Sequence, residues 1–370
     1  MLKKVILINY RNIAKADISP SPTTTVVFGE NGQGKTNLIE GIYLACILKA
    51  VRAPFDKELI RFGEDTAVVT VFFEQEQLEI SVFPWGKEIR LNTKVKTGLE
   101  VLGKFKAIMF SPRDLELVFG PPVNRRKFLD IVLALTDQEY LYNLASYNRV
   151  LKQRNKVLLF LNEGRSEDLD IWSQELINYG ARLWLKRATF LKDINEIFKK
   201  ISADLSNLGT LHLEYETKIK TMVPKSEKQI KQSFALELNK ARNSEIKFKT
   251  TLIGPHRDDF KIISETIFEE KVISKDLGSF GSQGEARIAA VCLKLAEIEY
   301  FKERGNDPTF LLDDVFSELD KTHQENLIKI LDKNQTIITT NSLDIFPENV
   351  QKKALILKIA AGKIEEFKTE

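Results

Sequence analysis

Gly29-Glu30-Asn31-Gly32-Gln33-Gly34-Lys35-Thr36 fits the phosphate-loop pattern G-x-x-x-x-G-K-[ST]. Its setting fits as well, because a strand-like apolar run, Val26 to Phe28, precedes it and a helical pattern, Thr36 to Lys49, follows it. Glycines in such a loop let backbone N–H groups wrap the β- and γ-phosphates of a nucleotide, and the helix N-terminus adds the positive end of its dipole. The stretch therefore predicts a strand, a phosphate-binding loop and a helix in an α/β fold.

The side chains of this loop predict what it holds. Lys35 supplies a positive charge at the phosphates, and Thr36 supplies a hydroxyl oxygen for Mg²⁺. We therefore expect ATP and Mg²⁺ as cofactors, with Lys35 also taking part in catalysis. The expected nucleotide-binding residues of the loop are Glu30, Asn31, Gly32, Gln33, Gly34, Lys35, Thr36 and Asn37.

A second motif, Phe310-Leu311-Leu312-Asp313-Asp314, reads as a buried strand that ends in two acids. A phosphate-binding loop needs an acid of this kind on a neighbouring strand, so Asp313 is expected to hold Mg²⁺ through water. Asp314 is then placed to orient or deprotonate the attacking water, which makes it the expected catalytic acid or base. The alternative is that Asp314 only caps the turn that follows.

The third motif is the Ser- and Gly-rich stretch 279–285, which opens a predicted helix from Glu285 to Phe301. Such a stretch is either an ordinary helix cap or an anion site at a helix N-terminus. A single phosphate-binding loop offers no further phosphate for it, so an anion site here predicts a nucleotide shared with a second copy of the chain. Ser282 and Gly284 are then expected to contact that nucleotide, whereas the role of Glu285 stays open.

The order of the motifs predicts a discontinuous head domain. Helical patterns cover residues 124–135, 138–161 and 168–204, and strand patterns return at 211–215, 248–252 and 260–263. We therefore expect one α/β head made from residues 1–110 and 245–370, with a mainly helical domain or arm, residues 111–244, inserted between its two parts.

Composition excludes several other classes of protein. The 370 residues are 43% hydrophobic and 29% charged, with a formal net charge of +3, which excludes a disordered chain and a strongly basic one. The N-terminus has only four consecutive apolar residues, Val5 to Ile8, and no segment is long and apolar enough to cross a membrane. Cys46 and Cys292 stand alone in apolar stretches and read as core residues. We therefore expect a cytoplasmic protein without a membrane partner.

A local basic cluster is a candidate surface for DNA phosphates. Arg125, Arg126 and Lys127 begin a predicted helix and follow Arg113 closely in the sequence. The alternative is a solvent-facing basic turn, or an internal ion pair with Asp130.

Taken together, the motifs resemble those of the RecF family of ATP-binding-cassette heads, which is related to the heads of chromosome-maintenance ATPases. The resemblance spans nearly the whole chain and rests on these stretches: GENGQGKTNLIE (29–40), PRDL (112–115) with NRRKFLD (124–130), GPHRDD (254–259), SQGE (282–285) and LLDDVFSELD (311–320). It implies an ATP-binding-cassette-type P-loop ATPase head with an inserted, mainly helical domain.

The resemblance also implies a function. ATP joins two subunits in such proteins, the nucleotide lies between the P-loop of one and the Ser282 loop of the other, and slow, DNA-stimulated hydrolysis separates them. The family binds DNA, favouring junctions at gaps, and acts with RecO and RecR to place RecA on gapped single strands. By the same resemblance, Asp320 belongs to a loop that crosses the dimer interface, and Thr339, Thr340 or Asn341 stands near the switch position.

Two departures from the wider cassette pattern qualify this expectation. Asp314 stands where many cassette ATPases have Glu, and its shorter side chain predicts slow turnover; Glu285 stands where Gln is common. His256 in GPHRDD is either part of a structural turn or a catalytic group. The rival functions are the ATPase subunit of a membrane transporter and a P-loop kinase of a small acceptor.

Overall fold

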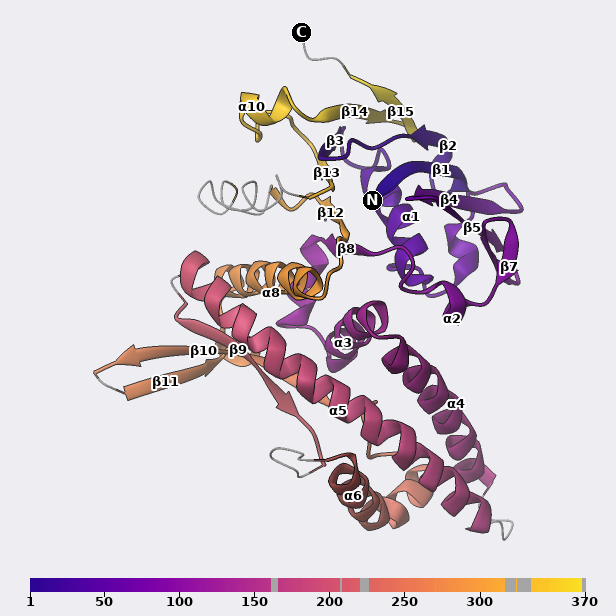
Figure 1. Cartoon of the computed structure of the whole chain (residues 1–370), viewed down its shortest axis with the longest axis vertical. Helices are drawn as coiled ribbons and strands as arrows, with labels where there is room; N and C mark the ends of the chain where they lie inside the picture. The colour runs from indigo at the N-terminus through magenta and orange to yellow at the C-terminus, as the bar shows by residue number, and fades with distance from the viewer. Residues whose placement is uncertain are drawn as a thin grey trace. The chain divides into compact units, whose positions relative to one another are not determined.

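The computed structural model describes residues 1–160, 166–206, 208–219, 226–269, 271–316, 324 and 334–367. The chain forms two compact units, one made of Met1–Asp114 with Phe301–Glu370 and the other of Leu115–Tyr300 (Figure 1). Both ends of the sequence thus contribute to the first unit.

The first unit contains two sheets and the helix that follows the P-loop. Its elements are β1 (Leu2–Tyr10), β2 (Ile13–Ile18), β3 (Thr24–Phe28), α1 (Lys35–Ile47), η1 (Asp56–Leu59), β4 (Ala67–Phe73), β5 (Glu76–Phe83), β6 (Gly86–Leu91), β7 (Lys94–Lys96), α2 (Gly98–Val101), β8 (Ala107–Phe110), β12 (Thr309–Asp313), β13 (Thr336–Thr340), α10 (Glu348–Gln351), β14 (Leu355–Ala360) and β15 (Lys363–Glu366). The short helix η2 (Pro112–Leu117) leads from this unit into the second.

One sheet has the order β15-β14-β3-β13-β12-β8 and is parallel except for its edge strand β15. All residues of β8, β12 and β13 are buried, as is typical of parallel strands that are covered on both faces. The register pairs Asp313 with Thr339, and Thr339 with Val27. The P-loop and the two acids therefore follow the carboxyl ends of neighbouring strands, where open α/β sheets bind ligands.

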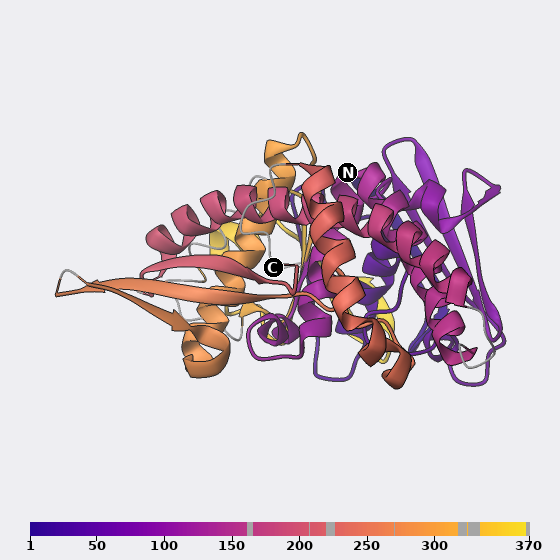
Figure 2. The same cartoon turned by 90° about the horizontal axis from the view of Figure 1, so that it is seen from below.

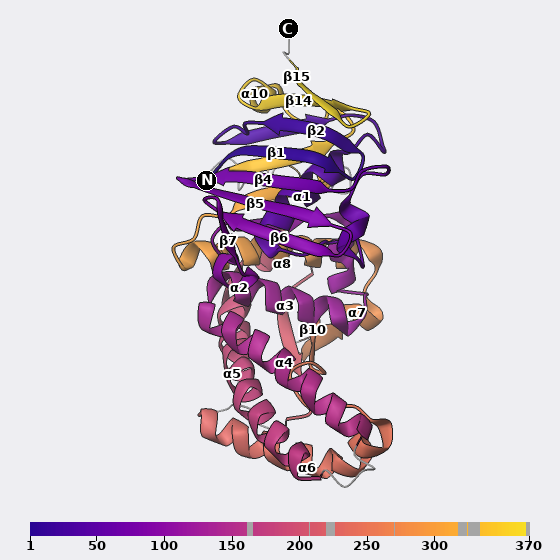
Figure 3. The same cartoon turned by 90° about the vertical axis from the view of Figure 1, so that its right-hand side faces the viewer.

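The other sheet is antiparallel, with the order β2-β1-β4-β5-β6-β7 (Figure 3). Helix α1 contacts β1 and β4 of this sheet and β12 and β13 of the parallel sheet. Nearly all of its residues are buried, which explains why apolar residues surround the whole helix. The predicted helix from Thr36 to Lys49 is confirmed, except that it ends at Ile47 because Leu48 takes a left-handed conformation with φ 54°.

The second unit is mainly helical and carries a three-stranded sheet in the order β11-β10-β9. Its elements are α3 (Pro122–Thr136), α4 (Gln138–Phe160), α5 (Ser166–Leu205), β9 (Thr210–Glu216), α6 (Glu227–Phe248), β10 (Asp259–Phe268), β11 (Lys271–Asp276), α7 (Leu277–Phe280) and α8 (Gln283–Glu303). β10 and β11 continue as a two-stranded hairpin beyond the end of β9, as Figure 2 shows.

The predicted helices of this region are confirmed as α3, α4, α5 and α8, but the predicted strand at 248–252 is wrong. Helix α6 continues to Phe248 and ends where Lys249 adopts a left-handed conformation with φ 53°. After the helix, the backbone N–H of Leu252 donates to a side-chain oxygen, Glu245 Oε1, at 2.7 Å, and not to a neighbouring strand. A short apolar run does not by itself distinguish a strand from a helix end.

The compact units differ from the domain division expected from the sequence. The second unit extends to Tyr300, whereas the expected insertion ended at residue 244. The reason is that β10 pairs with β9 along 210–216, and the ring of Phe190 in α5 packs at 4.8 Å from that of Tyr300 in α8. The division into a head, 1–110 with 245–370, and an arm, 111–244, therefore stays a prediction about functional domains.

Both cysteines are core residues, as expected. Cys46 and Cys292 are each 1% exposed, and burial raises the pKa of the Cys292 thiol to about 12. Within the part of the chain that the structure describes, none of the helices combines the length and the apolar character that a membrane crossing requires.

Candidate nucleotide-binding site

The P-loop is shaped by close packing of its glycines. A Cβ atom at Gly29 would lie 2.3 Å from the carbonyl oxygen of Ile359, which is closer than real Cβ atoms come. Gly34 has φ 117°, and a Cβ atom there would lie 2.8 Å from Oδ1 of Asn12. Gly29 therefore requires glycine because of the backbone beside it, and Gly34 requires it for its backbone conformation.

Two turns from other parts of the sequence hold the loop. The turn between β14 and β15 donates from the backbone N–H of Gly362 to the carbonyl of Gln33 at 3.0 Å, and from that of Ala361 to Gln33 Oε1 at 2.6 Å. From the turn between β1 and β2, Asn12 donates to the carbonyl of Gly32 at 3.3 Å. The loop is thus preorganised by backbone and amide groups that lie far from it in sequence.

Lys35 begins α1 and places its ammonium group within the loop. Nζ donates to the carbonyl of Gly29 at 2.5 Å, to the carbonyl of Glu30 at 2.9 Å and to Oδ1 of Asn341 at 2.6 Å. An ammonium has three donors, so these three acceptors satisfy it completely. Lys35 is 7% exposed, and its charge lies inside the loop that the sequence predicts to cradle phosphate.

The electrostatic setting of Lys35 favours an anionic ligand. Burial lowers the pKa of Lys35, because a charged ammonium loses solvation there, and the negative charges of Asp314 and Asp313 oppose this effect. A phosphate group beside the ammonium would act in the same direction as the two carboxylates. The loop therefore gains from a bound anion.

Asp313 is held by two hydroxyl groups. Thr36 donates to Asp313 Oδ1 at 3.0 Å, and Thr339 donates to the same oxygen at 2.8 Å. Asp313 is 6% exposed, and burial raises the pKa of its carboxyl group, while the hydrogen bonds from Thr339 and Thr36 oppose the rise. The two residues that the sequence predicts to hold Mg²⁺ are therefore in direct contact.

The oxygen donors at this contact fit Mg²⁺. A threonine hydroxyl and a carboxylate are hard ligands, and Mg²⁺ is commonly bound by one or two carboxylates together with substrate phosphates and water. No group of three or more His, Cys, Asp or Glu side chains that could hold a metal ion occurs among the described residues. The site thus suits an ion that arrives with a nucleotide better than an ion in an all-protein cage.

Asp314 follows the strand in a turn. Its φ of 52° lies in the left-handed region, which aspartate tolerates better than most residues. Its backbone N–H donates to the carbonyl oxygen of Thr339 at 3.2 Å and to the Thr339 hydroxyl at 3.1 Å. The strand therefore ends between the two acids, and the negative charge of Asp314 is near enough to influence Lys35.

The Ser282 loop closes on itself within one chain. Glu285 N–H donates to Ser282 Oγ at 3.3 Å, and Ser282 N–H donates to Glu285 Oε2 at 2.7 Å, so the two residues form a reciprocal cap at the start of α8. A hydrogen-bonded ion pair with Lys275, 2.8 Å away, and the bond from Ser282 lower the pKa of Glu285 to about 2. The stretch therefore forms the helix cap that was one of the two alternatives, and Glu285 is part of that cap.

The same loop remains accessible at its outer side. Ser282 and Gly284 are exposed, and a Cβ atom at Gly284 would meet nothing within 4 Å. Their contact with the nucleotide of a second copy stays a prediction. Asp320, expected at the dimer interface, lies outside the described residues together with the rest of the SELD stretch.

Arg125 and Arg126 make internal contacts. Arg125 binds Asp259 through two parallel hydrogen bonds of 2.7 Å, and its side chain is 11% exposed. Arg126 is half-buried and donates to the carbonyl of Asp258 at 2.9 Å. The internal-pair alternative is therefore present, but with Asp259 as the partner in place of the expected Asp130.

The other two candidates for DNA contact lie on the surface. Arg113 and Lys127 are exposed, Arg113 in the first unit and Lys127 at the start of α3 in the second.

Asp130, the partner expected for the basic cluster, pairs with Arg187 of α5 at 2.8 Å, and Tyr140 donates to the same carboxylate at 2.6 Å.

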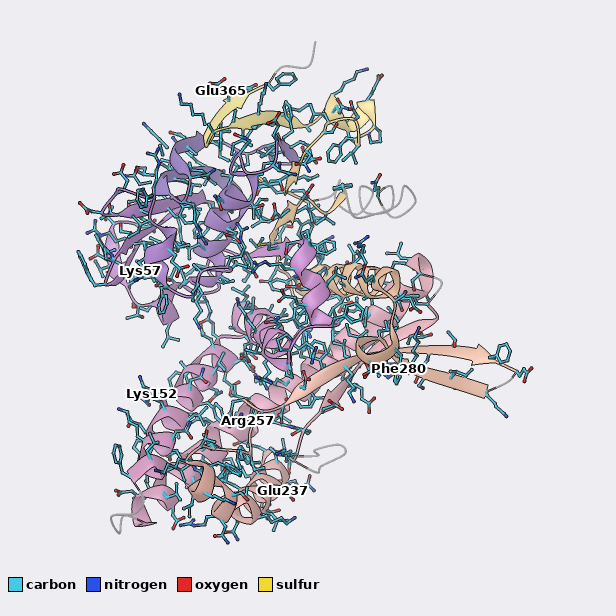
Figure 4. All side chains as sticks on the ribbon, turned by 180° about the vertical axis from the view of Figure 1, so that it is seen from behind. Lys57, Lys152, Glu237, Arg257, Phe280 and Glu365 are labelled. Carbon is cyan, nitrogen blue, oxygen red and sulfur yellow. The ribbon has the colours of Figure 1, made fainter. Side chains whose placement is uncertain are left out.

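His256 has a structural environment. Its Nε2 lies 3.2 Å from the carbonyl of Thr251, which can only accept, and its Nδ1 lies 2.6 Å from the Tyr147 hydroxyl. Burial lowers its pKa to about 4, so the ring is neutral, with the proton on Nε2 and Tyr147 donating to Nδ1. Its neighbour Arg257, which is labelled in Figure 4, is exposed and donates from Nε to the same carbonyl at 3.2 Å. These contacts favour the turn alternative over catalysis.

The sequence analysis predicted Asn37 as a nucleotide-binding residue but missed the cluster that it forms with Asn12 and Arg52 beside the P-loop. Asn37 donates to Asn12 at 2.8 Å and accepts from Arg52 at 3.1 Å, and Arg52 also pairs with the buried Glu40. The cluster borders a cavity of about 770 Å³ that is lined by Arg11, Asn12, Asn37, Arg52, Glu58, Ile60, Arg61 and Phe62. No sequence signal joins these residues, since the fold alone brings the turn after β1 to the start of α1.

Comparison with known proteins agrees with this geometry. Residues 1–356 match the family described as the RecF/RecN/SMC N terminal domain. The chain is 35% identical to the DNA replication and repair protein RecF of Agathobacter rectalis, over 99% of each protein.

Solved structures show the same likeness. A structure of the recombination mediator protein RecF with ATP, from the RecFOR pathway, has a TM-score of 0.90 and 31% identity, covering 99% of this chain and 97% of that one. An Smc head bound to the C-terminal winged-helix domain of ScpA has a TM-score of 0.57 and 16% identity, covering 100% and 98%, and shows the fold alone. The expected fold class, an ATP-binding-cassette-type P-loop head with mixed α/β sheets, is confirmed.

Proposed function

The chain belongs to the RecF family of DNA replication and repair proteins, and from this premise we propose that it is an ATP-dependent DNA-binding protein of recombinational gap repair. ATP binding joins two copies of the chain on DNA, and ATP hydrolysis separates them. The protein acts in the cytoplasm and has no membrane partner.

The observation that carries this proposal is the convergence of Lys35, Thr36 and Asp313 at one edge of the parallel sheet. The Thr36 hydroxyl lies 3.0 Å from Oδ1 of Asp313, and Lys35, the first residue of α1, places its ammonium group within the P-loop. A phosphate-binding loop, a hydroxyl and a buried acid in this arrangement are the parts that P-loop ATPases use to hold a nucleotide with Mg²⁺. The RecF structure with ATP supports the same ligand.

The residues divide the work of hydrolysis. Lys35 exchanges its loop carbonyls for phosphate oxygens, and Thr36 and Asp313 hold Mg²⁺, which when bound neutralises charge on the β- and γ-phosphate oxygens. Asp314 orients the attacking water and takes its proton. Because aspartate is one methylene shorter than glutamate, Asp314 reaches the water poorly, and hydrolysis is slow.

A second copy completes the site. Ser282 and Gly284 of one copy approach the nucleotide held by the P-loop of the other, and Asp320 lies at the same interface. The exposed Ser282 and the N-terminus of α8, a helix of 21 residues, supply a hydroxyl and oriented N–H groups for the terminal phosphate. In this exchange Ser282 leaves its cap with Glu285, which makes closure depend on the nucleotide.

DNA is bound through its phosphates. Arg113 and Lys127 provide exposed charges for this contact, whereas Arg125 and Arg126 support it indirectly by holding the GPHRDD turn. Contacts of this class position a protein without reading sequence, which suits binding at junctions of single- and double-stranded DNA in gaps. There the protein works with RecO and RecR to place RecA, and DNA stimulates its ATPase.

Measurement of molecular mass in solution tests the proposal. Light scattering with ATP and Mg²⁺, with ADP and without nucleotide, each with and without gapped DNA, should show a dimer only with ATP, and more of it on gapped DNA. A monomer under all conditions would refute the switch. ADP release that depends on a small acceptor and not on DNA would instead support a kinase, and co-purification with a membrane protein would support a transporter subunit.

A further inference from the structure

Thr339 lies between the two strands that carry the nucleotide-binding residues. It is the fourth residue of β13, and it pairs with Asp313 of β12 on one side and with Val27 of β3, just before the P-loop, on the other. Its side chain is 0% exposed. A hydroxyl at this position has no solvent partner, so its hydrogen bonds are made within the protein.

The direction of these hydrogen bonds follows from the donors. The backbone N–H of Asp314 can only donate, so the Thr339 hydroxyl accepts from it at 3.1 Å. The hydroxyl proton is then available to the Asp313 carboxylate at 2.8 Å, with the Leu312 carbonyl at 3.4 Å as the weaker alternative. One hydroxyl thus connects both acids.

Each connection constrains an acid in a different way. At Asp313, the bond fixes the carboxylate itself, and it ends on the oxygen that also accepts from Thr36. At Asp314, the bond adds to the one that the same N–H makes to the Thr339 carbonyl at 3.2 Å, and both hold the left-handed turn with φ 52° that starts directly after the strand. The two consecutive acids can therefore have different roles. Asp313 faces Thr36, and Asp314 lies beyond the end of the strand.

We propose that Thr339 is a positioning residue for ATP hydrolysis, whose hydroxyl holds the Asp313 carboxylate toward Thr36 and fixes the turn that carries Asp314. This inference rests on the proposed function, because it assigns the metal to Asp313 and the water to Asp314. Outer-shell partners of this kind typically change metal affinity or activity by about 10–100-fold when they are removed.

The strand itself supplies a matched control. Thr336 is also 0% exposed in β13, but its hydroxyl donates to the local carbonyl of Asn334 at 3.1 Å, at the other end of the strand from the acids. Thr336→Val therefore removes a buried threonine hydroxyl from the same strand without touching the site. A loss that is only structural should be similar in Thr336→Val and Thr339→Val.

The test compares Thr339→Val, Thr339→Ser and Thr336→Val in the full chain. For each variant, calorimetry measures ATP binding with and without Mg²⁺, and a steady-state assay measures kcat and KM. Thr339→Val should lower kcat by about 10–100-fold and weaken the effect of Mg²⁺ on ATP binding, while binding without Mg²⁺ is kept. Thr339→Ser should restore most of both, and Thr336→Val should behave as the wild type.

Several outcomes would overturn the inference. Thr339→Val could have the same kcat and the same Mg²⁺ dependence as the wild type, or it could also lose ATP binding in the absence of Mg²⁺. Thr336→Val could lose as much kcat and Mg²⁺ dependence as Thr339→Val. If Thr339→Val does not fold, Thr339→Cys replaces it, and its weak S–H donor should give an intermediate loss, whereas wild-type kinetics would refute the role. If the wild type forms no dimer, the proposed switch fails, but the Mg²⁺ titration still reports on Thr339.

Discussion

The ammonium group of Lys35 donates to Oδ1 of Asn341 at 2.6 Å, which joins the P-loop to the residue just after β13. The other two donors of Lys35 bind carbonyls of the loop itself, so Asn341 is its only side-chain acceptor among the contacts the structure describes at this ammonium. The charge that would meet a phosphate is therefore held in place before any ligand arrives. This arrangement makes Lys35 the first residue to test.

Lys35→Ala should abolish ATP binding, because the loop loses its buried positive charge and the group that reaches the phosphates. Isothermal calorimetry measures the affinity directly. Lys94→Ala is the control, since Lys94 is exposed in β7 and makes no hydrogen bond or ion pair with those site residues that the structure describes. An affinity equal to that of the wild type would contradict the assignment of the P-loop.

Asp313→Asn should have opposite effects on stability and on ligand binding. Burial raises the pKa of Asp313 above its ordinary value of 3.8, so the ionised carboxylate destabilises the nucleotide-free protein at neutral pH, and the uncharged amide should raise its melting temperature. The same change removes a carboxylate that holds Mg²⁺. Mg²⁺-dependent ATP binding should therefore weaken by more than the factor of about 10–100 that is typical when a hydrogen-bond partner of a metal ligand is removed.

The pH dependence of the wild type gives an independent check on Asp313. As the pH falls through the raised pKa, the carboxylate gains a proton and loses its affinity for the metal. Mg²⁺-dependent ATP binding should therefore weaken at a higher pH than an ordinary aspartate would require. A binding profile that stays flat down to the ordinary pKa would argue against a buried metal-binding carboxylate.

Asp314→Asn should leave ATP bound but slow its hydrolysis by about 10²–10⁴-fold, because the amide cannot accept the proton of the water. The ATP-bound dimer should last longer, and light scattering over time measures this. Asp314→Glu restores the carboxylate with one more methylene and should hydrolyse ATP at least as fast as the wild type. If Asp314→Asn hydrolyses ATP normally, Asp314 only caps the turn.

Charge reversal at Arg113 and Lys127 should weaken DNA binding equally for all sequences. Each lost phosphate contact should lower the slope of log affinity against log salt by about one. Fluorescence anisotropy over a range of salt concentrations measures both quantities. Lys94→Glu controls for the change in net charge in each single variant, and an unchanged slope in the double variant would place the DNA elsewhere.

Arg125→Ala provides a contrast to these surface variants. It leaves the Asp259 carboxylate without its bidentate partner in a partly buried position, 16% exposed. Breaking a fully buried ion pair typically costs about 3–5 kcal/mol. Because this pair is only partly buried, the free energy of unfolding should fall by less than that. Urea denaturation measures the loss, and a stability equal to the wild type would show that the pair contributes nothing.

His256 should make the stability of the protein depend on pH. Its pKa falls from an ordinary 6.5 to about 4 in the folded chain, so the unfolded chain binds the extra proton between these values. Stability should be lost as the pH falls from about 6.5 to about 4, by up to about 3 kcal/mol. The difference between the wild type and His256→Gln in urea denaturation isolates this effect, and parallel curves would show that His256 does not contribute.

The P-loop, α1 and the acid-ended strand β12 could be predicted from the sequence because their signals are local. Eight consecutive residues set the loop pattern, and an apolar run followed by Asp313 and Asp314 sets the strand end. The helices α4 and α5 were equally predictable, since the helical period persists over many turns. The short run at 248–252 was not, because it carries no period long enough to separate a strand from the end of α6.

The partners of the predicted residues could not be found in the same way. The pairing of Arg125 with Asp259 spans 134 residues, and the contact between Lys35 and Asn341 spans 306. Nothing in the local sequence distinguishes Asp130 from Asp259 as a partner for Arg125. Only the packing of α3 against β10 makes that choice.

What the amino-acid sequence alone determined is therefore the chemistry: a phosphate-binding loop, two acids at a strand end and a serine cap before a helix. The tertiary structure decided which groups these residues touch, because strand register and helix packing place distant segments within hydrogen-bonding distance. Thr339 shows the difference, because its hydroxyl contacts Asp313 and Asp314 only when β13 lies between β12 and β3.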